Sequence, residues 1–366
     1  MQQKSQTSTL RRAAGILSIG LLLSSCYVTS QGTHYLSLRA KAVPAAAALA
    51  DSRTSPQVRL LLVRVAEVRS FATSTLGLRE TNNYTSIVTL DSDRLVTVVS
   101  ACAELSFDRY LWSYPIIGKF PFRGYFTPRE AQEEAARLKG KGWDTITRPV
   151  DAFSTLGWFT DPLFSFMASY SEADIADMIL QELTHATIFL KGEGDFDEEI
   201  SAFVGRQGSL VWLESKYGEN SSQVDELRKN RADDDAFSGW LRATAEELQA
   251  IYASGLTTAE KRAQKAAIID SRATDFRTEY ARHFVTDRYK DFPMEKLNNA
   301  YLDLYRIYEG EPTLYMDYYK KICASSMRRF IDEVARITKH GADPREEMRK
   351  ELTLGPLPPS EGGKVN

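Results

Sequence analysis

The residues best suited to chemistry lie in the stretch MILQELTHATIFL, at positions 178–190. On a helix, residues four apart share one face, so Gln181 and His185 point the same way and Glu182 lies within reach of that side. In the zinc-binding pattern H-E-x-x-H, two imidazoles at this spacing bind the metal, and the glutamate polarises a zinc-bound water. Here Gln181 stands where the first histidine would be, so the pattern is kept except at one metal ligand.

A third ligand could come from the next predicted helix, which opens with Glu198 and Glu199. The order of helix, turn and acidic helix is the gluzincin arrangement. The pentapeptide alone is weak evidence, because amphipathic helices often contain Gln, Glu and His. Apolar residues around it predict that the first helix is buried, and a buried Glu beside a His needs a partner or a metal.

Gln181 should weaken any zinc site. Its amide oxygen can approach a metal, but it is a neutral, hard donor where zinc favours imidazole. We therefore expect zinc to be held weakly or lost. Glu199 is the first candidate for a substitute ligand, and Asp197 and Glu193 are further candidates from the turn and helix start.

Two helices must position these residues, at 171–190 and at 198–218. Ser171 with Asp174 three residues later predicts the start of the first helix. Upstream, β-branched stretches at 84–90 and 94–103 predict a hairpin, and the aromatic segment at 113–126 predicts a loop and an edge strand. Within it, Arg123, Gly124 and Tyr125 are the candidate substrate-binding residues, since an extended peptide can add to a strand edge, although Tyr125 could equally be a core residue.

The rest of the chain predicts an α+β protein whose second half is mostly helical. Charged helical patterns joined by Gly255-Leu256-Thr257 predict a helical hairpin after residue 220. The expected organisation is a signal peptide, an entry segment, an α+β body, a block of C-terminal helices and a disordered tail, at 1–25, 26–55, 56–220, 221–350 and 351–366.

The N-terminus predicts export and lipid attachment. Basic residues precede the apolar run AAGILSIGLLL, which suits a signal peptide and is short for a spanning helix. The run ends in Leu-Ser-Ser-Cys at Cys26, which resembles the bacterial lipobox. We expect Cys26 to carry lipid and hold the protein in the bacterial cell envelope, on the periplasmic or surface side.

Composition excludes some classes of function. The net charge is −3, and basic residues are interleaved with acids, so no nucleic-acid surface is expected. Of the three cysteines, Cys102 and Cys323 remain if Cys26 is lipidated, and the sequence leaves open whether they pair.

Several longer stretches resemble one family, the bacterial predicted aminopeptidases, which are gluzincin-like zinc metallopeptidases. They are YPIIGKFPFRGYFTPREA, AFSTLGWFTDPL, QELTHATIFLKGEGDFDEEISAFV and LNNAYLDLYRIY, in this order from about Val65 to beyond Tyr308. The chain looks like a lipoprotein member with QELTH in place of HELAH. The resemblance implies a zincin-like body with a small mixed or antiparallel sheet. It also implies Glu182 as general base and His185 and Glu198 as zinc ligands.

Three functions remain open. The first is a membrane-anchored, metal-dependent aminopeptidase acting on peptides. The second is a pseudo-peptidase of the same fold that binds peptides or organises the envelope without a competent metal. The third is a purely structural helical lipoprotein in which residues 171–190 form only a core helix.

Overall fold

The computed structural model describes residues 33–34, 36–114, 118–150, 160–306, 312–339 and 343–354. It confirms an α+β protein with small sheets and a mostly helical second half. The described residues form two compact units that alternate along the chain. Unit 1 consists of the described residues within Met1–Ala42, Val88–Ser154 and Asp235–Arg306. Unit 2 consists of the described residues within Val43–Ile87, Thr155–Asp234 and Ile307–Asn366. The domain boundaries expected from the sequence stay a prediction.

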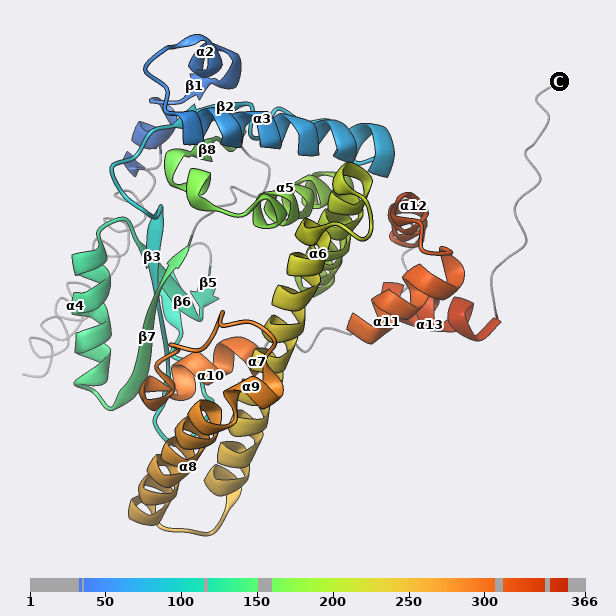
Figure 1. Cartoon of the computed structure of the whole chain (residues 1–366). Coiled ribbons are helices and arrows are strands. Elements are labelled where there is room, and N and C mark those ends of the chain that lie inside the picture. The colour runs from blue at the N-terminus through green and yellow to red at the C-terminus, as the bar shows by residue number, and fades with distance from the viewer. Residues whose placement is uncertain are drawn as a thin grey trace, which may run out of the picture. The chain divides into compact units, whose positions relative to one another are not determined.

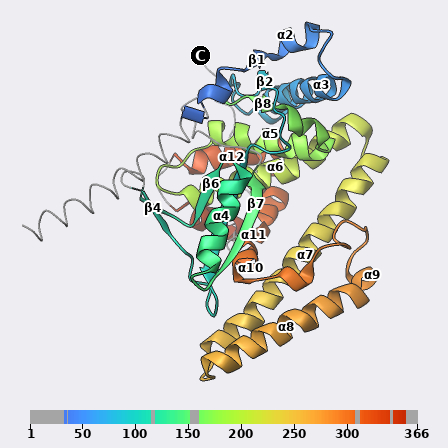
Figure 2. The same ribbon diagram turned by 90° about the vertical axis from the view of Figure 1, so that its left-hand side faces the viewer.

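Unit 1 contains a three-stranded antiparallel sheet in the order β6, β3, β7. The bounds are Phe122–Tyr125 for β6, Val96–Ala103 for β3 and Trp143–Val150 for β7. Helix α4 (Pro128–Lys139) covers one face of this sheet (Figures 1 and 2). There Val99 and Tyr125 pack with Leu138, because alternate residues of each strand turn the same way. A short separate pair, β4 (Trp112–Tyr114) and β5 (Gly118–Phe120), follows β3.

The helical hairpin predicted after residue 220 is confirmed. It consists of α7 (Ser222–Ala253) and α8 (Thr258–Thr278) (Figure 2). The division between the units falls within α7. Thr257 and Glu260 form a reciprocal capping box at the start of α8. Buried apolar residues of both helices share one core, which includes Leu241, Leu248 and Phe276. The shorter elements α9 (Tyr280–His283), η3 (Met294–Lys296) and α10 (Asn299–Arg306) follow.

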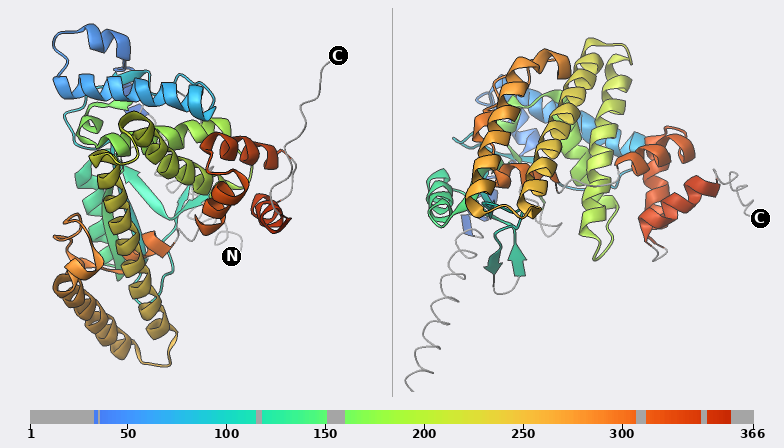
Figure 3. Two further views of the ribbon diagram at one scale, coloured as in Figure 1. Left: turned by 45° about the vertical axis from the view of Figure 1, so that its right-hand side comes forward. Right: turned by 90° about the horizontal axis from the view of Figure 1, so that it is seen from below.

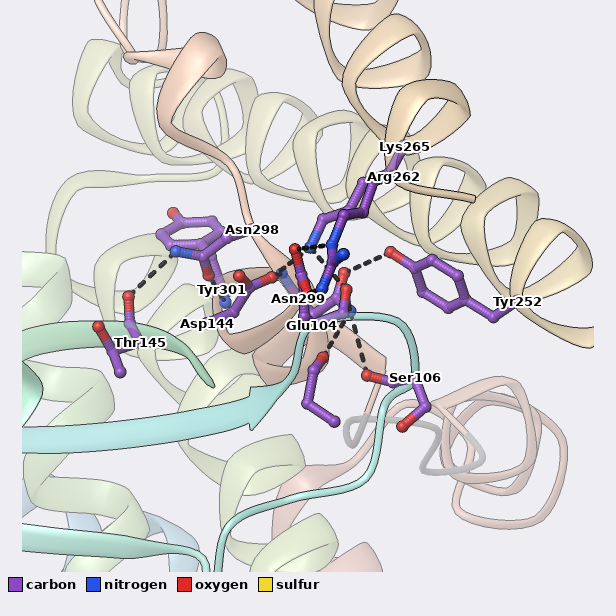
Figure 4. Close-up of polar contacts among 11 residues, drawn as sticks. Glu104, Ser106, Asp144, Thr145, Tyr252, Arg262, Lys265, Asn298, Asn299 and Tyr301 are labelled. Atoms are coloured by element: carbon purple, nitrogen blue, oxygen red, sulfur yellow. Dashed lines mark hydrogen bonds and ion pairs between the residues drawn. The ribbon is translucent and has the colours of Figure 1, made fainter. Parts of the chain in front are cut away.

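Asn299 ties several parts of unit 1 together (Figure 4). Its fully buried side-chain amide donates to the carbonyl oxygens of Ala103, Glu104 and Ser106, and its Oδ1 accepts from the Tyr252 hydroxyl at 2.8 Å. The Asn299 backbone N–H donates to Asp144 at 2.9 Å. The LNNA stretch therefore has a structural role.

Unit 2 is mainly helical and holds the predicted site helices. Helices α3, α5 and α6 pack together, with α5 next to α6 (Figures 1 and 3). Their bounds are Pro56–Phe71 for α3, Glu172–Thr187 for α5 and Gly194–Tyr217 for α6. A small sheet joins β1 (Val43–Pro44), β2 (Ser86–Val88) and β8 (Leu163–Phe164), and the other short elements before α5 are α2 (Ala45–Ala50), η1 (Ala72–Leu76) and η2 (Ser165–Ser169). The C-terminal elements are α11 (Pro312–Asp317), η4 (Tyr318–Ile322), α12 (Met327–Ile337) and α13 (Pro344–Leu354).

The hairpin predicted from 84–90 and 94–103 is wrong, although both stretches contain strands. β2 pairs with β1 and β8, whereas β3 lies between β6 and β7. β-branched residues favour extended backbone, but they do not select the strand that will pair with it.

Cys102 and Cys323 are both free and buried.

The predictions at the two ends of the chain fall largely outside the described residues. These are the signal peptide, the lipid site Cys26 and the tail beyond Leu354. None of the helices in the described ranges is both long enough and apolar enough to span a bilayer.

Candidate functional site

Helix α5 begins where the sequence predicts. The Ser171 hydroxyl accepts the Asp174 backbone N–H at 3.1 Å and satisfies a free donor of the first turn. Ile175, Ile179 and Leu183 are buried along one stripe of the helix. This burial fixes the rotation of α5, so Gln181, Glu182 and His185 take partly exposed positions, whereas Thr184 is buried.

Helix α6 begins four residues earlier than predicted, at Gly194. Asp197, a candidate substitute ligand, is therefore inside the first turn of α6. Its buried carboxylate accepts the Leu190 backbone N–H at 2.9 Å and so pins the connection between α5 and α6. Burial raises the pKa of Asp197, against the lowering effects of the Leu190 N–H and the nearby His185.

His185 and Glu198 meet across the two helices. His185 Nε2 lies 3.7 Å from Glu198 Oε1, and the side chains are 28% and 76% exposed. Two atoms that each bind zinc at about 2.0–2.2 Å can be this far apart. The geometry thus suits two donors for one ligand or ion.

Gln181 is engaged elsewhere. Its Nε2 donates to Asp177 Oδ1 at 2.6 Å, one turn earlier on α5. Asp177 also faces Arg231, whose Nη2 is 4.0 Å from Oδ2. Burial raises the pKa of Asp177, although Gln181 and the arginines oppose that shift.

Gly205 of α6 lets this pair form. A Cβ at position 205 would collide with Gln181 Cγ and Asp177 Oδ1, and it would lie 2.8 Å from the Asp177 carbonyl oxygen. The absence of a side chain at Gly205 therefore allows α6 to approach α5 closely at the level of Gln181.

The donor set does not fit a three-ligand zinc site. Catalytic zinc is held by three protein ligands drawn from His, Cys, Asp and Glu, with one position left open. Among the residues that the structure describes, no three such groups are arranged to hold a metal ion. His185 and Glu198 supply two donors, and the third position is an amide bonded to Asp177.

Glu182 is the most perturbed acid of the site. Burial, together with the negative charges of Asp161 and Glu198, raises its pKa to about 7. Asp161 is itself buried, and its backbone is fixed by Asn83 and by the Tyr84 N–H, at 3.2 and 2.7 Å. Glu182 can therefore exchange a proton near neutral pH.

Glu199, the first candidate for a substitute ligand, is bound by other protein groups. It accepts hydrogen bonds from Arg345 Nε and Nη2 at 3.1 and 2.9 Å, and from the Tyr315 hydroxyl. A metal at this carboxylate would have to compete with the Arg345 guanidinium.

The predicted substrate-binding residues lie in unit 1, whereas the QELTH helix lies in unit 2. β6 is at one edge of its sheet. Tyr125 is buried in the core with α4, and the Arg123 guanidinium lies 5.4 Å from the Tyr125 ring centre. Gly124 pairs with Val98, and a Cβ there would lie 2.9 Å from a Val96 methyl carbon.

Asp161, Asp177 and Arg345 are site residues that the sequence reasoning did not identify. Asp177 stands four residues before Gln181, so its helical spacing was a usable signal. No local pattern links Arg345 to Glu199, since 146 positions separate them.

One comparison with known proteins gives a match. A family model described as "Putative aminopeptidase" matches residues 26–349. No curated protein and no solved structure matches the chain. The family match includes all of α5 and α6.

Proposed function

Because the chain belongs to this aminopeptidase family, we propose that it is a lipid-anchored, peptide-binding protein whose hydrolytic chemistry is impaired. In this proposal the peptide lies against the part of α5 and α6 that carries Glu182, His185 and Glu198. Separately, in unit 1, Arg123, Gly124 and Tyr125 are proposed as a strand edge to which an extended peptide could add. Lipid on Cys26 would hold the protein in the bacterial cell envelope.

The hydrogen bond from Gln181 to Asp177 is the observation that carries this proposal. It commits the amide at the first ligand position to a neighbouring carboxylate. A neutral amide also binds zinc less well than an imidazole, so two independent reasons lower the zinc affinity. What remains is a polar site with an exposed Glu198 and a proton-exchanging Glu182.

A second candidate is metal-dependent aminopeptidase activity. The pKa of Glu182, near 7, suits a general base at neutral pH, and the 3.7 Å separation of His185 and Glu198 suits shared ligation. In this candidate Glu182 would be the base and Gln181 a weak third ligand.

Metal content and hydrolysis separate the two candidates. The full chain is purified in detergent without chelator and with zinc supplied. Zinc is then measured per chain, and release of amino-terminal residues from short peptides is followed. For the natural protein we expect less than one zinc per chain and no hydrolysis. For Gln181→His we expect one zinc per chain and hydrolysis of the peptides.

Gln181→Asn is the matched control, because it keeps an amide and adds no imidazole. Stoichiometric zinc in the natural protein, together with hydrolysis that Glu182→Gln abolishes, would establish the second candidate and reject the first.

A further inference from the structure

The C-terminal helices of unit 2 contact the beginning of α6 through Glu199. Arg345, at the start of α13, donates from Nε and Nη2 to Glu199 Oε2 at 3.1 and 2.9 Å. Tyr315 of α11 donates its hydroxyl to the same oxygen. The side chains of Glu199 and Arg345 are 21% and 19% exposed, so water screens this ion pair less than a surface pair.

Aromatic packing surrounds this ion pair. The Arg345 guanidinium lies 5.4 Å from the Phe196 ring centre, and the Phe196 and Tyr315 rings are 6.4 Å apart. Two turns further along α6, Phe203 packs 4.8 Å from Phe330 of α12. Figure 3 shows the C-terminal helices beside α6. The first turns of α6 are therefore held by apolar contacts as well as by charge.

These contacts act on the turn that carries Glu198. Glu198 is 76% exposed, and within the described part of the chain His185 is its one ion-pair partner. The Glu198 side chain is thus weakly held, so its location depends on the backbone of its turn. Glu199, the next residue, fixes that backbone to α11 and α13.

We propose that Arg345 and Tyr315 are positioning residues, which set where Glu198 stands relative to His185 by anchoring Glu199. This inference rests on the proposed function, because it concerns the same polar pair that would contact the peptide. It makes α11 and α13 part of the site's support, although both lie far from QELTH in the sequence.

The same helices contain a closely matched control. Glu351 accepts hydrogen bonds from Tyr318 and Arg336, which is again one glutamate with one tyrosine and one arginine. This second group joins η4, α12 and α13 to one another and does not include α6. Variants of Arg336 or Tyr318 should thus reproduce the stability cost without moving Glu198.

Histidine resonances of the full chain, labelled with carbon-13 at the imidazoles, test the proposal. Glu198→Gln first gives the direction in which the His185 resonance moves when the carboxylate is lost. We expect Arg345→Gln to move this resonance the same way. We expect Arg345→Lys to leave it close to its position in the natural protein. His283 is the internal reference, because it lies in unit 1 and its ion-pair partner is Glu279, with Nε2 3.6 Å from Oε2.

Hydrogen exchange of residues 194–200 is the second measurement. We expect Arg345→Gln to lower amide protection there at least about tenfold, since it removes charge-assisted bonds to Glu199. Tyr315→Phe keeps the ring packing and removes one donor, so it provides a milder variant if Arg345→Gln does not fold.

Arg336→Gln and Tyr318→Phe should leave the His185 resonance and the hydrogen exchange of residues 194–200 unchanged. Their melting temperatures should fall about as much as those of the Arg345 and Tyr315 variants. The proposal is overturned if folded Arg345 and Tyr315 variants behave like the natural protein, or if the Arg336 and Tyr318 variants produce equal changes. Zinc content is determined on the same samples, so failure of the proposed function is recorded separately.

Discussion

Two polar clusters, one fully buried and one partly buried, differ in how completely their polar groups are paired. Around Asn299 in unit 1, the side-chain amide is matched by three carbonyl oxygens and one hydroxyl (Figure 4). Around Glu182 in unit 2, the carboxylate accepts no hydrogen bond from the part of the chain that the structure describes, and two further acids raise its pKa.

This difference distinguishes a structural cluster from a candidate site. Buried polar groups that serve only the fold are satisfied, because each unpaired group costs free energy. An acid kept under-paired near neutral pH lowers stability and is typical of functional sites. Substitution at the two centres should therefore change stability in opposite directions.

Asn299→Ala should have the largest effect. It leaves three carbonyl oxygens and the Tyr252 hydroxyl without their partner in a buried place, so we expect a loss of about 4 kcal/mol in the free energy of unfolding. Urea denaturation followed by circular dichroism measures it. Asn298→Ala is the control and should cost about 1 kcal/mol, because Asn298 is only half-buried and makes two such bonds. Equal losses for the two variants would contradict the role given to Asn299.

Glu182→Gln should stabilise the protein, by about 3 kcal/mol at pH 8. The folded-state pKa is raised from 4.5 to about 7, so the ionised form is penalised in the folded chain. Below pH 4.5 the carboxyl is protonated in both states and the variant should gain nothing. The advantage grows as the pH rises from 4.5 to 7 and is complete above 7. Denaturation curves at pH 4, 6 and 8 with chelator present measure this trend, and a variant that is less stable than the natural protein at pH 8 would refute it.

The sequence predicted individual helices and strands better than it predicted which strands pair with each other. Ser171 predicted a helix start correctly because capping is local, and the turn predicted at Gly255-Leu256-Thr257 does separate α7 from α8. The strands in 84–90 and 94–103 were assigned to each other wrongly, since pairing depends on distant segments. The early start of α6 was missed because Gly192 and Gly194 indicate a turn, whereas Asp197 stabilises the connection from inside the helix.

Within the site, helical spacing predicted Gln181, Glu182 and His185 as candidate site residues. The acidic start of the next helix added Glu198. The roles of these residues stay predictions. Asp177 was overlooked because a single acid on an amphipathic helix is usually solvated. Gln181 could not be judged from its type alone, because the bond to Asp177 depends on how closely Gly205 lets α6 approach.

Gly205→Ala should have an intermediate effect, a loss of about 2 kcal/mol. The new Cβ would meet the Asp177 backbone oxygen, which cannot move without shifting α5. Gly208→Ala is the control, because its Cβ would meet a Leu180 methyl carbon at 2.9 Å, which can rotate away. The helix propensity of alanine should make the Gly208 variant nearly neutral. Thermal unfolding of both variants measures the difference, and two equal melting temperatures would mean that the Gln181 region is loosely packed.

Arg262→Gln should have the smallest effect, although Arg262 stands next to the Asn299 cluster (Figure 4). It makes two hydrogen bonds to Glu104 at 2.8 and 2.7 Å, but its side chain is 56% exposed, and surface ion pairs contribute little. We expect no measurable change in the urea midpoint. Lys265→Gln is the contrast, because Lys265 is 12% exposed and pairs with Asp144, which also receives the Asn299 N–H. It should cost about 2 kcal/mol, since the partly buried Asp144 loses its cation. If Arg262→Gln proved as costly as Lys265→Gln, exposure would not be what sets the strength of these pairs, and the contrast between the two clusters would have to rest on hydrogen bonding alone.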